Sequence, residues 1–227
     1  MWVKSEPNDH EKYLFQKAQT YIQKIIWIPG IRMIAVANSL SMYATHEDSD
    51  IDLFVITAKN RIWIVRILMT LCFSSYGVWR KGEDIAENFC LSFFVEEESM
   101  DLSKIAIKDD IYLYFWIYYL KPIYEVGDIY ERFLRENTWV DVPLDMRSED
   151  HKYALPTWSI EYPSARLMQV ILTLCNRIFW FFWEYKSLRS YEKKGSPFGV
   201  MIHPTLLKFH DTDRRVEIRD SIQRDQI

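Results

Sequence analysis

The stretch Asp48-Ser49-Asp50-Ile51-Asp52-Leu53-Phe54-Val55-Ile56-Thr57 decides the fold, because it places two acids at the start of an apolar run rich in β-formers. Such a run predicts a buried strand over residues 50–57. Successive side chains of a strand point to opposite faces, so Asp50 and Asp52 are expected side by side, about 6–7 Å apart at Cα. Two carboxylates on a strand built for burial are costly unless something offsets their charge.

A divalent cation is the usual partner of such a pair. Mg²⁺ in particular is held by one or two carboxylates together with substrate phosphates, so the pair predicts phosphate chemistry. A calcium-binding EF-hand loop starting at Asp48 is excluded, because the Gly and Glu that this loop requires are absent from their positions. A purely structural interpretation stays open, in which Asp48 and Asp50 belong to a turn and Asp52 pairs with a core arginine such as Arg66.

The composition is that of a globular protein. Of 227 residues, 49% are hydrophobic and 26% are charged, and the formal net charge of −4 does not indicate a surface that coats nucleic acid. Cys72, Cys90 and Cys175 are scattered and odd in number, which indicates buried free thiols in a reducing compartment. The polar N-terminus shows no signal peptide, so a cytoplasmic location is expected.

Two apolar segments, 62–78 and 167–183, are interrupted by polar residues and fall short of the roughly 20 apolar residues that span a bilayer. We expect them to be buried or interfacial helices. If the aromatic stretches 112–119 and 179–183 are not covered by the fold, they form a surface for a protein partner or for a membrane, which leaves a membrane-peripheral location open.

The order of elements predicts an α+β fold: a small mixed sheet flanked by helices, followed by a helical C-terminal half. We therefore expect a core over residues 1–108 and a helical region over residues 109–227. The expected strands cover 32–37, 50–57 and 89–95, the expected helices cover 11–26, 62–79, 109–120, 129–135, 164–194 and 211–224, and residues 138–163 are expected to form a linker or wrapping loop.

The sequence resembles the nucleotidyltransferase superfamily, whose fold is shared with DNA polymerase β. The small polar pair Asn38-Ser39 follows the first expected strand, and ten residues separate it from Asp50-Ile51-Asp52 in the second. This order matches the family signature of Gly-Ser, a variable gap and Asp-x-Asp. Weaker similarity to uncharacterised bacterial nucleotidyltransferase-domain proteins extends over residues 28–36, 61–63 and 209–215.

The resemblance implies a Mg²⁺-dependent enzyme that moves a nucleoside monophosphate from a nucleoside triphosphate to a hydroxyl of a small molecule or a protein. Asp50 and Asp52 would hold two Mg²⁺ ions at the in-line displacement. Asn38 and Ser39 would lie against the triphosphate, with Ser39 donating its hydroxyl and N–H to a phosphate oxygen and a following helix adding a favourable dipole. The implied partners are a nucleoside triphosphate and an unidentified acceptor, and nucleic acid is not expected.

Two departures from the family pattern leave a second function open. The family's first Gly is Asn38 here, which tolerates a left-handed backbone but is bulkier beside phosphate. The family's third carboxylate falls at Ser92, a poor metal ligand and a poor base. Either Glu96 or Asp48 replaces it, or two acids suffice, or the chain no longer catalyses. In that last case it is a catalytically degenerate nucleotide-binding or interaction module.

Overall fold

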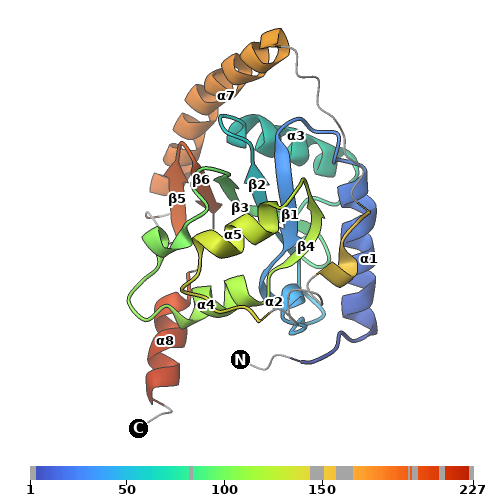
Figure 1. The fold of residues 1–227 in the computed structure, drawn as a ribbon, viewed down its shortest axis with the longest axis vertical. Coiled ribbons are helices and arrows are strands. Elements are labelled where there is room, and N and C mark those ends of the chain that lie inside the picture. The colour runs from blue at the N-terminus through green and yellow to red at the C-terminus, as the bar shows by residue number, and fades with distance from the viewer. Residues whose placement is uncertain are drawn as a thin grey trace.

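The computed structural model describes residues 4–81, 84–143, 151–156, 166–193, 195, 199–209 and 213–224. At its centre is one six-stranded mixed sheet with the strand order β4-β1-β2-β3-β6-β5 (Figure 1). Neighbouring strands are antiparallel except for β2 and β3, which are parallel. The expected α+β class is confirmed. The strands are β1 (Ile31–Val36), β2 (Ile51–Thr57), β3 (Phe89–Glu96), β4 (Lys121–Glu125), β5 (Val200–His203) and β6 (Leu206–Phe209).

Seven α-helices lie among the described residues, and the six expected helices each correspond to one of them. They are α1 (Asp9–Gln23), α2 (Asn38–Ser41), α3 (Ile62–Ser75), α4 (Ile111–Tyr118), α5 (Ile129–Glu136), α7 (Arg166–Lys193) and α8 (Arg215–Arg224). Two 3-10 turns, at Leu102–Ile105 and His151–Tyr153, join them. Much of the expected linker, and residues 211–212 at the expected start of the last helix, lie outside the described residues.

The sequence predicts a helical C-terminal half. In the structure this half also supplies three of the six strands. β4 pairs with β1, and β6 pairs with β3. Pro122 lies within β4, and a proline argues against a strand because it cannot donate a hydrogen bond to the sheet. It is tolerated here because β4 is an edge strand. A boundary at residue 108 would therefore divide one continuous sheet.

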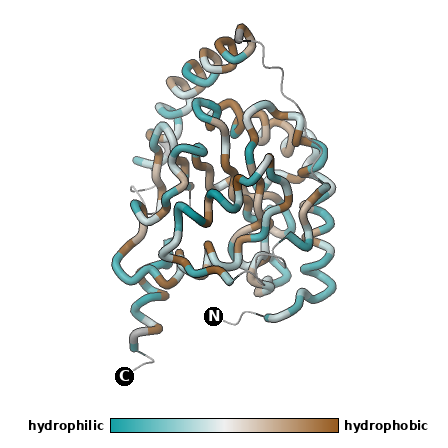
Figure 2. Tube along the Cα trace, viewed as in Figure 1, coloured by the Kyte–Doolittle hydropathy of each residue, from teal (hydrophilic) through white to brown (hydrophobic). Residues whose placement is uncertain are grey.

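Helices cover both faces of the sheet, and all seven residues of β2 are buried. Leu53 and Val55 point to the face covered by α1 and α3, while Phe54 and Ile56 point to the face covered by α4 and α5. Figure 2 shows hydrophobic residues in the central strands and recurring along α7. Because side chains alternate along a strand, Asp52 shares the α4–α5 face with Phe54.

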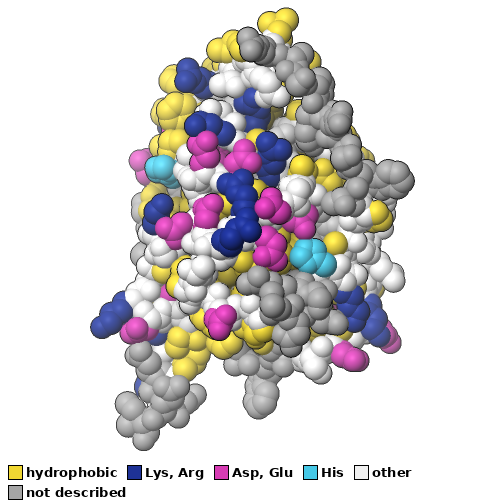
Figure 3. Space-filling view, in the orientation of Figure 1, with side chains coloured by type: hydrophobic (Ala, Val, Ile, Leu, Met, Phe, Trp, Pro, Cys, Tyr) yellow, Lys and Arg dark blue, Asp and Glu magenta, His cyan; other side chains and the backbone are white. Residues whose placement is uncertain are grey.

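α7 is attached to the rest of the protein by polar side chains and by Phe179, which packs against the core. Gln169 Oε1 lies 2.7 Å from Nη2 of Arg61, and Asn176 Oδ1 accepts hydrogen bonds from the N–H groups of Trp63 (3.0 Å) and Ile64 (3.1 Å). These N–H groups belong to the first turn of α3, whose N-cap residue, Arg61, does not cap the helix with its own side chain. Asn176 therefore caps α3. Figure 3 shows hydrophobic side chains exposed at the end of the molecule where α7 lies. No described helix combines the length and the hydropathy needed to cross a membrane.

Candidate functional site

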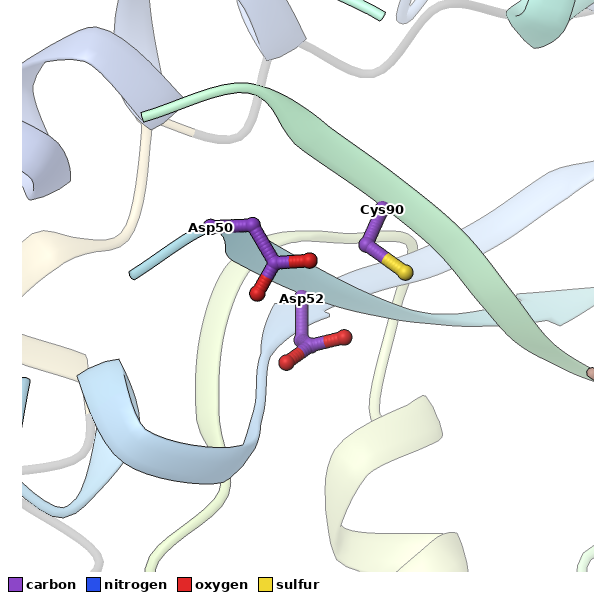
Figure 4. A group of neighbouring side chains, drawn as sticks. All are labelled: Asp50, Asp52 and Cys90. Atoms are coloured by element: carbon purple, nitrogen blue, oxygen red, sulfur yellow. The ribbon is translucent and has the colours of Figure 1, made fainter. Parts of the chain in front are cut away.

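Two carboxylates and a thiol meet where β2 begins (Figure 4). Asp50, Asp52 and Cys90 each offer one ligand atom, and these three atoms lie within 4.8 Å of one another. Asp50 directly precedes β2, Asp52 is its second residue, and Cys90 stands opposite Asp52 on the parallel strand β3. The structure thus brings the two aspartates together and adds Cys90, which the sequence suggests only as a buried thiol.

Asp52 lies among neutral hydrogen-bond donors. It is 9% exposed, and its carboxylate accepts hydrogen bonds from the side chains of Asn38, Cys90 and Ser92. Burial raises the pKa of Asp52 above its ordinary value, although these bonds act in the opposite direction. The donors satisfy the carboxylate oxygens without cancelling the charge.

Asp50 has a cationic neighbour. Nη1 of Arg80 lies 2.7 Å from Oδ2 of Asp50 and 3.8 Å from Sγ of Cys90. Burial and the charge of Asp52 nevertheless raise the pKa of Asp50 to about 6, against the opposing effect of Arg80. With both carboxylates ionised, one guanidinium leaves the group with a net negative charge, which suits a divalent cation.

The donor set fits a hard cation through its oxygens. Burial and the two carboxylates raise the pKa of the Cys90 thiol, so the thiol stays protonated and acts as a donor to Asp52. Only the thiolate is a good metal ligand, and it favours softer metals than Mg²⁺. Asp50 and Asp52 are therefore the residues that could hold Mg²⁺, with Cys90 beside them as a neutral group.

Asn38 adopts a left-handed backbone with φ 56°, the conformation for which asparagine is the best substitute for glycine. The Tyr112 hydroxyl donates to Asn38 Oδ1 at 3.0 Å, which leaves the side-chain amide N–H to donate to Asp52. Ser39 follows as a half-buried residue in α2. Since α2 has only four residues, it adds a much smaller dipole to this site than the sequence leads one to expect.

Glu96 does not reach the two aspartates. It pairs with Thr57 at the far end of β2, six residues beyond Cys90, which is about 20 Å along a strand. Its carboxylate accepts the N–H of Arg61 at 3.3 Å, where α3 begins. The prediction that Glu96 could complete the metal site is corrected by this register, because the carboxylate serves the start of a helix instead.

The alternative in which Asp52 forms an ion pair with Arg66 does not agree with the observed contacts. Arg66 donates a hydrogen bond to the carbonyl of Leu91, and its guanidinium lies 4.0 Å from the ring centre of Phe209. Because α3 covers the opposite face of the sheet, Arg66 does not pair with Asp52. Asp48 lies exposed in the preceding turn and does not join the group.

A pocket of about 240 Å³ lies beside Asn38, between this residue and the C-terminal elements. Its walls combine aromatic side chains with cations from β6 and α8. The lining residues are Asn38, Phe93, Tyr112, Leu113, Trp116, Lys208, Asp213, Arg214, Arg215 and Ile218. No local sequence signal marks this pocket, because residues more than 170 positions apart build it.

No protein-family model matches this chain, and no curated protein matches it. The nucleotidyltransferase resemblance therefore stays a prediction. It rests on the sequence motifs Asn38-Ser39 and Asp50-Ile51-Asp52.

Without a metal ion, Asp50→Asn is expected to stabilise the protein near pH 7.5. Folding raises the pKa of this carboxyl from 3.8 to about 6, so the folded state disfavours its ionisation. Its contribution to stability is therefore full below pH 3.8 and is lost as the pH rises through about 6. At about 1.4 kcal/mol per pKa unit, the variant gains up to about 3 kcal/mol at pH 7.5 and little at pH 4.

Urea denaturation of both proteins in EDTA at the two pH values measures this difference. Asp48→Asn is the matched control, because it removes an exposed carboxylate two residues away. A gain that is the same at both pH values would show that the Asp50 carboxylate is well solvated.

Proposed function

We propose that this chain is a nucleotidyltransferase of the polymerase β-like type, which moves a nucleoside monophosphate from a nucleoside triphosphate to a hydroxyl acceptor. The observation that carries the proposal is the convergence of Asp50 and Asp52 at the start of a central strand, beside a left-handed Asn38. The order of these residues, and the mixed sheet that holds them, are those of the superfamily signature.

Each residue of the group has a distinct role in this proposal. Bound Mg²⁺ would stabilise the attacking and leaving oxygens of the in-line displacement. Asp50 and Asp52 supply the carboxylate oxygens that hold the cation. Asn38, held in place by Tyr112, shapes the backbone against which the triphosphate lies. Arg80 is the cation closest to Asp50, and its planar guanidinium suits contact with a phosphate oxygen.

The reaction itself is a displacement at phosphorus. The acceptor oxygen forms a bond to the α-phosphorus while the bond from that phosphorus to the oxygen bridging to the β-phosphate breaks, and pyrophosphate leaves. The acceptor hydroxyl gives up its proton to solvent or to a base.

A nucleotide-binding module without catalysis is the second candidate, and Cys90 and Ser92 favour it. These residues occupy the strand beside Asp52, where the superfamily has its third carboxylate. Neither is an acid, and both act as donors to Asp52, so neither takes a proton from an acceptor as a general base does. In this case the chain binds a nucleoside triphosphate and does not turn it over.

Calorimetric titration with ATP and with GTP, in Mg²⁺ and in EDTA, tests binding, and pyrophosphate release tests transfer. Labelling of small molecules and proteins of a cell extract by α-labelled nucleotide identifies acceptors. The enzyme predicts Mg²⁺-dependent binding together with pyrophosphate release. Binding without release supports the nucleotide-binding module. If neither ATP nor GTP binds, the enzyme is contradicted and a degenerate interaction module becomes the better interpretation.

A further inference from the structure

The side of α7 that faces the protein carries Gln169, Thr173 and Asn176 together with Phe179, which packs against the core, while a stripe of hydrophobic residues faces outward. Gln169, Thr173 and Asn176 make the inward hydrogen bonds to Arg61 and to the first turn of α3. The outward side carries seven hydrophobic residues that are 40–72% exposed. This α7 seam consists of Leu167, Ile171, Leu174, Ile178, Phe181, Tyr185 and Leu188.

The seam residues follow a strict heptad repeat. They are separated alternately by four and three residues over three heptads, and the repeat ends at the next position, Glu192. A straight helix that only rests on a surface has a period of 3.6 residues, so its stripe drifts by about 20° per heptad relative to a strict repeat. A sustained period of 3.5 is the pattern of a left-handed coiled coil.

We infer that α7 forms a parallel two-stranded coiled coil with α7 of a second copy of this chain. In heptad lettering the two isoleucines of the seam and Tyr185 occupy a positions, while its leucines and Phe181 occupy d positions. Isoleucine at a with leucine at d is the combination that favours parallel dimers. The inference is independent of the proposed catalytic function, because none of the seam residues lies in the acidic group.

The charges beside the seam complement each other in this arrangement. Glu184 occupies a g position, and Arg189 occupies the e position of the following heptad. In a parallel pair, a g residue faces the next e residue of the other helix, so Glu184 faces Arg189 of the partner subunit. The twofold axis creates this ion pair twice. An antiparallel pair places g opposite g and e opposite e, and it loses both ion pairs.

A bilayer surface is the other environment that would cover a long apolar stripe. A membrane-surface helix keeps a solvated, mostly basic polar side opposite its apolar side. The polar side of α7 instead binds the body of the protein through Asn176, and the charges nearest the seam, Arg177, Glu184 and Arg189, have mixed sign. Among the described residues, the body lies on the side of α7 opposite the seam, so none of them separates the seam from a second copy.

Light scattering after size-exclusion chromatography tests the inference on the full chain. We expect the wild-type protein to be a dimer and Ile178→Asp, at the centre of the seam, to be a monomer. The substitution buries an unpaired carboxylate at the interface, so the dimer dissociation constant is expected to rise about a hundredfold or more. Lys186→Asp places the same carboxylate at an exposed b position of the same helix, and this control is expected to stay dimeric. Circular dichroism checks that both variants keep the fold.

A charge swap tests the direction of the helices. At low salt, Glu184→Arg and Arg189→Glu are each expected to raise the dimer dissociation constant by about tenfold, and the double variant is expected to restore it. A double variant that stays weak would overturn the parallel arrangement. A wild-type monomer, or a dimer that survives Ile178→Asp, overturns the inference altogether. A monomer that sediments with phosphatidylglycerol vesicles and loses this property in Ile178→Asp would assign the seam to a bilayer.

Discussion

Asp52→Asn is expected to abolish Mg²⁺-dependent nucleotide binding while the fold stays intact. The substitution removes one of two carboxylates that could hold the cation and brings the net charge of the group with Asp50 and Arg80 from negative to zero. We expect the affinity for ATP or GTP in Mg²⁺ to fall by about a hundredfold or more, comparable with the loss of a charged partner in a desolvated site. The fold tolerates the change, because burial raises the pKa of Asp52 and its ionised form is thus a cost to the folded protein.

Calorimetric titration of wild type and variant with the same nucleotides measures the loss. Asp48→Asn is again the matched control, since it removes a carboxylate from the exposed turn and leaves the group complete. A thermal unfolding curve for each variant separates a lost site from a lost fold. If Asp52→Asn and Asp50→Asn both bind nucleotide like the wild type, the nucleotide lies elsewhere, and the pocket beside Tyr112 becomes the first place to examine.

Arg215→Met is expected to lower the free energy of unfolding by about 3–5 kcal/mol, the usual consequence of removing one partner from a buried ion pair. Arg215 is the first residue of α8 and is 2% exposed. Its guanidinium lies 3.0 Å from Oδ2 of Asp110 and 2.9 Å from Oδ2 of Asp213, and it donates to the carbonyl of Ile105 at 2.9 Å. Asp110 also caps α4 through the N–H of Leu113, so Arg215 joins two helices.

The loss of Arg215 leaves two buried carboxylates with one buried cation, Lys208, which lies 3.0 Å from Asp213. Although burial opposes it, hydrogen bonds from Arg215 and the charge of Lys208 lower the pKa of Asp213 to about 2. The stabilisation linked to a lowered pKa is present above the ordinary value of 3.8 and is lost as the pH falls towards 2. The deficit of Arg215→Met is therefore expected to stay constant from pH 7 to pH 5 and to shrink below pH 4.

Urea denaturation across this pH range provides the measurement, with Arg214→Met as the control. Arg214 is the neighbouring arginine, but its ion pair with Glu217 is exposed, so its loss changes stability by no more than about 0.5 kcal/mol. Equal effects of the two substitutions would mean that the buried network does not hold α8 in place.

The strongest local patterns of the sequence predict much of the fold. Helices with clear periodicity, such as those at 11–26 and 129–135, and the strands around Asp50 and Phe89 all form where expected. β4, β5 and β6 escape prediction because they are short, and because β4 contains Pro122, which only its position at the sheet edge makes acceptable. Strand pairing joins distant parts of the chain, so a local sequence pattern does not show which strands pair.

That Asp50 and Asp52 lie side by side where a buried strand begins follows from the sequence, because the alternation of side chains along a strand is a local property of the backbone. The groups that surround them follow from strand pairing. The parallel register of β2 and β3 places Cys90 opposite Asp52. The same register places Glu96 six residues further along β3, about 20 Å from Cys90.

The heptad spacing of α7 can likewise be read from the sequence, but the sequence does not show which side of the helix faces outward. That depended on the partners of its polar residues, since Asn176 accepts hydrogen bonds from the first turn of α3 and the apolar seam then faces solvent. A buried backbone N–H without a partner is costly, so the hydrogen bonds from Trp63 and Ile64 favour the orientation in which Asn176 faces the body of the protein.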